Sequence, residues 1–299
     1  MYKNIKTKMK ISVIVTNFNG ISLLKKYFET IVLMSKEADE IIFTDDASID
    51  ESVNYIKKLQ IKYPKIKIIA HKKNVGFGAN SNIAVKKSIG DLVVLLNSDI
   101  KPHDNYIKNT LHHFKNPKIF GVGFAELGHE NWARIFWANG YLQHEPGLNT
   151  GKTHISAWVS GGSSIIRKKL FLKLGGFDPV YAPFYGEDLD IGLRAWKSGY
   201  KLLWEPTAIV EHCHESTISK FPKRFLDYVK ERNRLLTTLR NFTNSNFLYS
   251  NSWGRLSRIL SGPNYIKIIR AAKKQIRENP KPIVFPTLSE QELLSLFKK

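Results

Sequence analysis

The first hundred residues alternate between short, continuously apolar runs and segments with the spacing of amphipathic helices. The apolar runs are Ile11–Val15, Glu40–Phe43, Ile66–Ala70 and Leu92–Leu96. Between them, apolar side chains recur three and four residues apart, which predicts helices over 23–33, 52–61 and 79–89. Short apolar strands joined by helices are typical of a parallel sheet covered on both faces. The sequence therefore predicts an α/β fold.

Polar residues follow each predicted strand. These clusters are Thr16-Asn17, Asp45-Asp46, His71 to Asn74 and Asn97 to Asp99. Open α/β sheets bind their ligands beyond the carboxyl ends of the strands. We therefore expect the four clusters to converge on one crevice.

The stretch from residue 124 to 158 has no regular period and contains three tryptophans and three histidines. Such a segment is typical of loops or short strands that lie over a site. Regular patterns resume beyond it. They predict a strand and a helix within 163–174, a helix over 188–198, and strands over 201–204 and 208–210.

The pattern from Ile218 onward is that of basic amphipathic helices, with a break at Gly262-Pro263. The chain has a formal net charge of +20, and residues 218–299 alone carry 17 basic and 5 acidic side chains. Such an excess points to nucleic acid, anionic lipid or phosphorylated substrates as partners. We therefore expect two parts, a domain over 10–217 and a basic helical extension over 218–299.

Composition and hydropathy exclude several classes of protein. Hydrophobic residues make up 42% of the chain, which is too many for a disordered protein. The single cysteine, Cys213, allows no intramolecular disulfide and favours a reducing compartment. The longest apolar run, Leu92 to Leu96, is far below the ~18 residues of a membrane span, and no signal-peptide pattern is visible. We therefore expect a cytoplasmic protein.

Four longer motifs carry a resemblance to a known family. They are ISVIVTNFNG (11–20), FTDDASIDES (43–52), NVGFGANSNIAVKKSIGDLVVLLNSD (74–99), and GGFDPVYAPFYGEDLDIGLRAWKSGY (175–200) followed by VEHCHEST (210–217). In this order the motifs resemble the family 2 inverting glycosyltransferases of the GT-A fold, particularly the bacterial rhamnosyltransferase-like branch that builds surface polysaccharides. The resemblance covers residues 10–217 and implies that this part is a GT-A catalytic domain.

The resemblance implies a nucleotide-binding role for the first two strand ends. Asp45 occupies the position of a carboxylate that accepts a hydrogen bond from the pyrimidine ring of the donor, and Asp46 stands beside it. Thr16, Asn17 and Asn19 can bond to the base or ribose. The alternatives are local, because Asp45 can cap the next helix and Asn19 suits a turn.

Glycine-containing segments complete the expected donor pocket. Backbone N–H groups near Gly76 can approach a diphosphate, and Asn74 and Asn80 lie on the same segment. By resemblance, Gly161 and Gly162 face the sugar and the acceptor. A tight turn is the alternative for Gly161 and Gly162, and a plain strand-to-helix turn is the alternative for Gly78, which follows Gly76 in this segment.

A metal site is implied where the family has its DXD motif, here Asn97-Ser98-Asp99. Carboxylates at this position hold Mg²⁺ or Mn²⁺ against the donor diphosphate. Asn97 replaces the first acid, which leaves Asp99 as the strong ligand and should weaken the metal. His212 matches a position where several members supply a further ligand, and His214 is the alternative two residues away.

The acidic run Glu187-Asp188-Leu189-Asp190 carries the catalytic expectation. Inversion by direct displacement needs a base that takes the proton of the acceptor hydroxyl. The resemblance assigns this role to Asp188, with Glu187 orienting the acceptor or Asp188. Acidic residues also suit a helix N-terminus, and Asp190 is expected to cap the helix or pair with Arg194.

These residues together predict a metal-dependent inverting glycosyltransferase that uses a dTDP- or UDP-sugar. By resemblance the first donor to consider is a rhamnosyl nucleotide, with UDP-galactose or a UDP-N-acetylhexosamine as alternatives. The acceptor would be a surface-polysaccharide or lipid-linked glycan, and the basic extension would bind the anionic inner face of the cell membrane. A nucleic-acid-binding protein is the alternative of another class, although zinc-ligand spacing and helix-turn-helix signals are missing from the sequence. A non-catalytic scaffold is a third reading, supported only by Asn97.

Overall fold

The computed structural model describes residues 9–129, 132–212, 221–262, 264–282 and 286–298. Within them, one nine-stranded sheet has the order β3-β2-β1-β4-β10-β6-β11-β5, with β9 paired to β11, and β7 and β8 form a separate hairpin. The strands are β1 (Ile11–Asn17), β2 (Glu40–Asp45), β3 (Ile66–Ala70), β4 (Leu92–Asn97), β5 (Ile100–Pro102), β6 (Ile119–Glu126), β7 (Ala133–Ala138), β8 (Tyr141–Pro146), β9 (His154–Ile155), β10 (Ser163–Arg167) and β11 (Lys201–His212).

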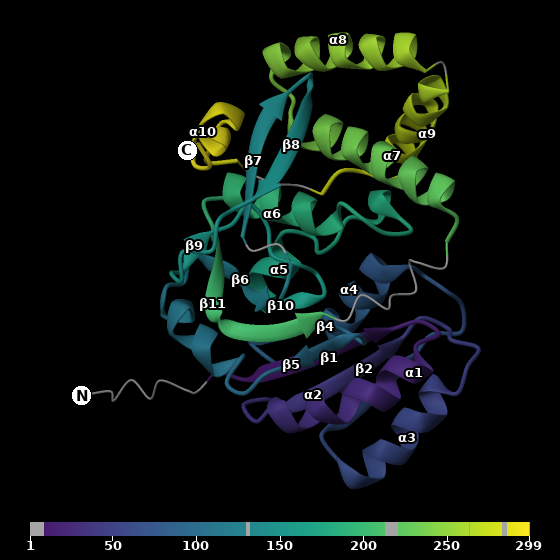
Figure 1. Cartoon of the computed structure of the whole chain (residues 1–299), viewed down its shortest axis with the longest axis vertical. Helices are drawn as coiled ribbons and strands as arrows, with labels where there is room; N and C mark the ends of the chain where they lie inside the picture. The colour runs from purple at the N-terminus through teal and green to yellow at the C-terminus, as the bar shows by residue number, and fades with distance from the viewer. Residues whose placement is uncertain (1–8, 130–131, 213–220, 263, 283–285, 299) are drawn as a thin grey trace.

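Helices cover both faces of the sheet (Figure 1). They are α1 (Ile21–Leu23), the π-helical η1 (Leu24–Phe28), α2 (Glu29–Met34), α3 (Ser52–Lys62), α4 (Phe77–Lys87), the 3₁₀ helix η2 (Lys108–Lys115), α5 (Lys168–Lys173), the 3₁₀ helix η3 (Pro179–Tyr181), α6 (Glu187–Lys197), α7 (Lys223–Asn241), α8 (Ser245–Ser261), α9 (Tyr265–Glu278) and α10 (Glu290–Ser295). Val13 and Val15 point to a core shared with η1, α2 and α3, while Ile14 points to a second core shared with α4, α5 and α6. This alternation follows from the two-residue period of a strand.

The predicted α/β fold is confirmed, but part of the sheet is antiparallel. β1 pairs in parallel with β2 and β4, and β2 pairs in parallel with β3, as expected. β10 instead runs antiparallel to both β4 and β6. No crossover helix precedes it, because the segment before it forms the β7–β8 hairpin and short β9 rather than a βαβ unit. The prediction of loops or short strands over 124–158 is confirmed.

The two strands expected over 201–204 and 208–210 are one continuous strand, β11. Its pairing with β6 shifts register between Glu205 and Ile209. Pro206 lies in this shift and has no N–H to donate to a sheet ladder. The sequence pattern therefore predicts the position of this irregularity correctly, but it predicts a strand end where the strand continues.

The C-terminal helices pack onto the sheet domain and onto one another. Leu235 and Leu236 of α7 share a buried cluster with Val180 and Tyr181, and Ala272 of α9 joins them. None of the helices in the described part of the chain has the length and hydropathy that crossing a membrane requires. Residues 213–220, which contain the expected 217/218 boundary, Cys213 and His214, lie outside the described residues.

Candidate active site

One cavity of about 290 Å³ lies at the carboxyl ends of β1, β2 and β4. Its lining includes thirteen residues expected from the sequence: Thr16, Asn17, Asp46, Asn74, Gly76, Asn80, Asn97, Ser98, Asp99, Gly161, Gly162, Glu187 and Asp188. All four strand-end clusters contribute at least one side chain. The expected convergence is therefore confirmed, and the acidic pair at the start of α6 reaches the same space.

The two adjacent aspartates at the end of β2 point to different partners. Asp46 lines the cavity, and its carboxylate accepts hydrogen bonds from the N–H groups of Val75 (2.7 Å) and Gly76 (2.9 Å). Asp45 is 1% exposed and accepts bonds from Asn17 Nδ2 (2.8 Å) and from the Ser48 N–H (2.8 Å) and hydroxyl (2.6 Å). Asp46 rather than Asp45 therefore stands at the cavity wall.

Asn19 also lies outside the cavity lining. Its N–H donates to Ser48 Oγ (2.7 Å), and its side-chain oxygen accepts from the N–H of Ile49 (2.9 Å). These bonds, with φ of +50° at Asn19, are those of a turn residue. Asn19 and Asp45 thus hold the loop that carries Asn17 to the cavity.

Two glycines are required by the local backbone and packing. Gly76, the residue before α4, has φ of +86°, a conformation that side-chain-bearing residues rarely adopt. A Cβ on Gly162 would lie 2.4 Å from the amide nitrogen of Asn97. Gly162 therefore leaves the room that Asn97 occupies at the cavity wall.

Asp99 and His212 face each other beside the cavity. His212 Nε2 lies 3.2 Å from Asp99 Oδ1, and His212 Nδ1 lies 2.9 Å from Glu126 Oε2. Burial alone would lower the pKa of His212, but the hydrogen bonds with Asp99 and Glu126 outweigh it and raise that pKa to about 10. Asp99 itself lines the cavity, whereas His212 is not part of the lining.

These residues fit a divalent cation. A carboxylate and an imidazole are ligands that Mn²⁺ accepts. A carboxylate on the far nitrogen, as Glu126 supplies, is the usual way to orient a metal-binding histidine. A metal would have to displace the proton that the two acids hold on His212. Glu126 was not predicted from the sequence, where its only signal is its position at the end of an apolar run.

A different group of potential metal ligands, His112, His113 and Glu205, lies away from this cavity. Hydrogen bonds already occupy Glu205. It accepts from His113 Nε2 (2.8 Å), Thr153 Oγ1 (2.8 Å) and Thr207 Oγ1 (2.7 Å). These hydrogen bonds therefore account for the arrangement of His113 and Glu205 without a bound metal.

The acidic pair begins α6, directly after the left-handed residues Tyr185 (φ +73°) and Gly186 (φ +100°). Glu187 is 7% exposed, and its Oε2 has no hydrogen-bond partner among the described residues. Burial, with the neighbouring Asp188 charge, raises the pKa of Glu187 to about 8. Burial also raises the pKa of Asp188, against the N–H of Leu189 that bonds to Asp188 Oδ1 at 2.7 Å.

The third acid in this run has a different position. Asp190 forms a buried 2.6 Å ion pair with Arg194, which confirms the expected pairing. Arg194 in turn donates to the carbonyls of Leu174 and Gly176. Asp190 therefore anchors α6 and leaves Glu187 and Asp188 as the pair that faces the cavity.

The C-terminal extension holds the loop before this pair, a contact that no local sequence pattern predicts. Asn233 of α7 donates from Nδ2 to the carbonyls of Tyr181 (2.9 Å), Phe184 (2.9 Å) and Tyr185 (2.6 Å). Phe184 and Tyr185 line the cavity. The extension therefore contributes to the geometry of the site.

Comparison with known sequences gives a family match. The family model described as "Glycosyl transferase family 2" matches residues 12–175. The O-antigen chain rhamnosyltransferase RfbN of Salmonella typhimurium is 26% identical over 235 residues, covering 73% of this chain and 71% of that protein. An N-acetylglucosaminyl-diphospho-decaprenol L-rhamnosyltransferase of Mycobacterium tuberculosis is 20% identical over 239 residues, covering 68% of this chain and 76% of that protein.

Solved structures give a fold match. The structure of GalNAc-T7 with UDP, GalNAc and Mn²⁺ superposes with a TM-score of 0.65 at 18% identity. The match covers 78% of this chain but only 48% of the GalNAc-T7 chain. The mannosyltransferase PcManGT from Pyrobaculum calidifontis with GDP-Man and Mn²⁺ has a TM-score of 0.60 at 15% identity, covering 90% of this chain and 76% of its own. The GT-A fold expected from the sequence is confirmed.

Proposed function

We propose that this chain, which belongs to glycosyl transferase family 2 and is a glycosyltransferase, is an inverting enzyme that transfers a sugar from a UDP- or dTDP-sugar to a glycan acceptor. One observation carries the proposal. The strand-end polar groups and the buried pair Glu187 and Asp188 line a single cavity. A donor bound at the strand ends would therefore present its sugar next to a carboxylate of raised pKa.

The chemistry is a single displacement at the anomeric carbon. The acceptor hydroxyl oxygen bonds to that carbon while the bond to the diphosphate oxygen breaks, and its electron pair leaves with the nucleoside diphosphate. Asp188 takes the hydroxyl proton as general base. The buried, unpaired Oε2 of Glu187 would accept a hydrogen bond from a sugar hydroxyl and orient it.

Asp99 and His212 would hold Mg²⁺ or Mn²⁺, and Asn97 lines the same cavity as Asp99. When bound, the cation would neutralise the charge that develops on the departing diphosphate. In the donor site, Asp46, Asn17 and Thr16 would face the base and ribose. Asn74, Gly76, Asn80 and Ser98 would face the sugar–diphosphate part, with Gly161 and Gly162 beside the sugar.

The names of the relatives support the finer part of the proposal. RfbN and the mycobacterial relative are named as rhamnosyltransferases, one acting on O-antigen chains and the other on a lipid-linked diphosphate sugar. We propose a rhamnosyl donor first and UDP-galactose or a UDP-N-acetylhexosamine as alternatives. The acceptor would be a surface-polysaccharide or lipid-linked glycan.

The basic extension, taken as residues 218–299 beside a catalytic domain of residues 10–217, would place the enzyme at the inner face of the cell membrane. Exposed apolar side chains on α8, including Trp253 (58%) and Leu260 (78%), support this placement together with the positive charge of the extension.

The first test is a thermal-shift and hydrolysis screen of the full chain against a panel of nucleotide sugars with Mn²⁺, Mg²⁺ or EDTA. We expect one dTDP- or UDP-sugar to stabilise the protein in a metal-dependent way and to be hydrolysed slowly. Asp188→Asn should bind that donor but lose about 10²–10⁴-fold in turnover. Asp227→Asn, an exposed aspartate of α7, is the matched control and should turn over normally. Absence of any response to pyrimidine nucleotides would contradict the proposal.

A further inference from the structure

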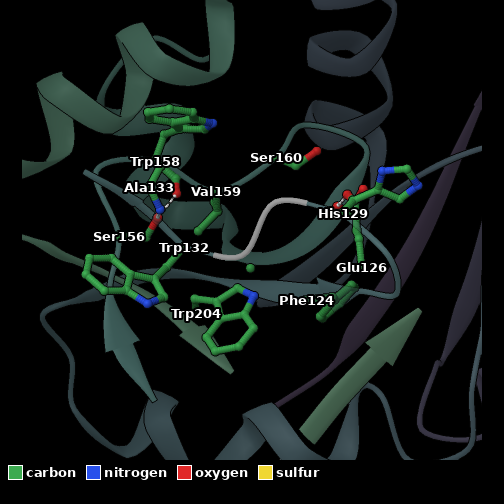
Figure 2. Close-up of a pocket in the computed structure, with 12 residues that line it drawn as sticks. Phe124, Glu126, His129, Trp132, Ala133, Ser156, Trp158, Val159, Ser160 and Trp204 are labelled. Atoms are coloured by element: carbon green, nitrogen blue, oxygen red, sulfur yellow. Dashed lines mark hydrogen bonds between the residues drawn. The ribbon is translucent and has the colours of Figure 1, made fainter. Parts of the chain in front are cut away.

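Residues 156–162 connect β9 to β10 and border the cavity on one side. Gly161 and Gly162 line the cavity together with Glu187 and Asp188. Other residues of the segment line a neighbouring pocket, namely Ser156, Trp158, Val159 and Ser160 (Figure 2). The segment is neither helix nor strand, yet it lies directly beside the acidic pair.

A backbone N–H of this segment acts on the proposed base. Burial raises the pKa of Asp188, and a hydrogen bond from the N–H of Gly161 lowers it. An N–H that bonds to a carboxylate stabilises its ionised form, which is the form that accepts a proton. The other titratable groups that act on the acidic pair are Asp190 on the same helix, Tyr185 before it and His144 on β8.

The sheet and the β7–β8 hairpin hold this segment at both ends. Ser156 donates its N–H to the carbonyl of Leu202 in β11 at 2.9 Å. The Ser156 hydroxyl oxygen accepts from the N–H of Ala133 in β7 at 3.1 Å (Figure 2). At the other end, the carbonyl of Gly162 accepts from the N–H of Asn97 at 3.0 Å. The segment is therefore a fixed backbone against which a packed helix can be located.

Helix α6 packs directly on this backbone. A Cβ on Gly192 would lie 2.6 Å from the carbonyl oxygen of Ala157 and 2.8 Å from Trp158 Cβ, so the approach requires a glycine. One turn further along, Trp196 Nε1 donates to the carbonyl of Ser156 at 2.9 Å. Trp196 is 3% exposed, so loss of this bond would leave a buried donor without a partner. A close backbone contact and a buried hydrogen bond therefore tie α6 to the segment.

The proposed base lies on the same face of α6 as these two contacts. Asp188, Gly192 and Trp196 follow one another at intervals of four residues, and side chains with this spacing lie along one side of a helix. Asp188 and Trp196 are separated by only about 12 Å along the helix axis. A shift of α6 at Trp196 would therefore reach Asp188 and change its distance from the N–H of Gly161.

The indole of Trp196 is also held by an aromatic contact. Phe297, which follows α10, packs against it edge-on, with ring centroids 5.5 Å apart and an interplanar angle of 90°. Phe297 is 5% exposed, so this contact is buried as well. Trp196 is not part of the cavity lining. It can therefore influence the site only through the position of α6.

We propose that Trp196 is a positioning residue, whose N–H fixes α6 on segment 156–162 and thereby places the Asp188 carboxylate against the N–H of Gly161. The proposal rests on the proposed glycosyltransferase function, in which Asp188 is the base. It adds a residue outside the cavity on which the orientation of that base depends.

The test is Trp196→Phe in the full chain, a change that keeps an aromatic ring but removes the N–H. Hydrolysis of the nucleotide sugar selected in the donor screen is measured from pH 5 to 9. We expect kcat at pH 7 to fall about 3–30-fold, while the affinity for UDP or dTDP stays unchanged because the strand ends remain in place. The acid limb of the kcat profile should move to higher pH by about 0.3–1 unit, because a weaker bond from Gly161 leaves the pKa of Asp188 higher.

Trp137→Phe is the matched control. Trp137 Nε1 also donates between two elements, from β7 to Ser250 Oγ of α8 at 3.2 Å, but this bond does not involve α6 or segment 156–162. The control should lower the Tm to a similar extent and leave kcat and the acid limb unchanged. Phe297→Leu covers the case in which Trp196→Phe fails to fold. It leaves α6 unaltered, loosens the indole and should move the acid limb in the same direction by a smaller amount.

The inference would be overturned if the Trp196→Phe protein, or Phe297→Leu in its place, lost Tm but kept the kcat and the acid limb of the Trp137→Phe control. Trp196 would then only stabilise the fold. Failure of the proposed function would look different, because Asp188→Asn would turn over like the parent or no pyrimidine nucleotide would bind. Both of these results come from proteins in which Trp196 is intact.

Discussion

Glu187 combines a buried carboxyl with a raised pKa, and this makes the stability of the protein depend on pH. The folded protein releases the Glu187 proton near pH 8, whereas the unfolded chain releases it near 4.5. Between these values the folded state holds more protons than the unfolded state, so the free energy of unfolding falls as pH rises.

Glu187→Gln removes this charge, and we expect the variant to have a higher Tm than the parent at pH 9 and a similar Tm at pH 5. Thermal unfolding from pH 4.5 to 9 measures the difference. Glu51→Gln, at an exposed position before α3, should leave the profile unchanged. Parallel Tm profiles for the parent and Glu187→Gln would show that Glu187 is not the group responsible.

Glu126 should control metal affinity although it is not expected to touch the metal. It bonds to His212 Nδ1 at 2.9 Å and so directs Nε2 toward Asp99. Glu126→Gln should weaken Mn²⁺ binding by about 10–100-fold, measured by calorimetric titration in the presence of UDP. His112→Ala tests the other histidine group and should leave the affinity unchanged. If Mn²⁺ affinity fell in His112→Ala but not in Glu126→Gln, the metal would bind at the His112 group instead of beside the cavity, which would contradict the proposed mechanism.

Residue types and their order were enough to predict which strand ends form the cavity, but not which residue of an adjacent pair faces it. Asp45 and Asp46 are identical in type and adjacent in sequence. Only the position of Ser48, whose N–H and hydroxyl hold Asp45, decides that Asp46 reaches the cavity. Such a choice depends on the path of a turn, which spacing does not determine.

Among the elements, α7 links the extension to the loop that precedes Glu187 and Asp188. The buried Asn233 side chain bonds to three carbonyls of the loop that leads into Glu187. Asn233→Ala would leave these carbonyls without their donor and should destabilise the fold by about 1–3 kcal/mol. It should also lower kcat with little change in the affinity for UDP, since the strand ends remain in place.

Chemical denaturation, nucleotide titration and turnover of the same preparations measure these three effects. Arg224→Ala changes an exposed side chain on the same helix and serves as the control. A normal kcat in a destabilised Asn233→Ala protein would mean that Asn233 stabilises the fold without positioning the pair.

Elements with a strong local pattern were predictable, and those defined by long-range pairing were not. β1 to β4 are short apolar runs separated by helices, so their parallel order follows from connection type. The antiparallel β10 depends on how the chain returns after the β7–β8 hairpin. That return depends on packing of the hairpin, where the Gly140 carbonyl accepts from Asn251 of α8 (2.8 Å), a contact 111 residues away in sequence.

At the scale of the whole molecule, the extension has two kinds of surface. The apolar stripes of α7 and α9 are largely used in packing, as Leu235, Leu236 and Ala272 show. One face of α8 is not covered, because Tyr249, Trp253, Leu256 and Leu260 are 67%, 58%, 43% and 78% exposed at a spacing of four, three and four residues. In Figure 1, α8 lies at the end of the molecule opposite α3.

This exposed face of α8, together with the positive charge of the extension, predicts binding to anionic membranes. An interfacial helix buries its apolar face at the headgroup boundary while basic residues contact anionic lipid. Replacing both Trp253 and Leu260 with serine should weaken binding to phosphatidylglycerol vesicles by about tenfold or more, measured by vesicle sedimentation of the full chain. Raising the salt concentration should also weaken the binding of the parent protein to the vesicles, because salt screens the charge of the basic residues. Ile61→Ser removes an equally exposed apolar side chain (86%) from α3 at the far end and should have no effect. Equal losses in both variants would show that exposed apolar area in general, rather than α8, drives the association.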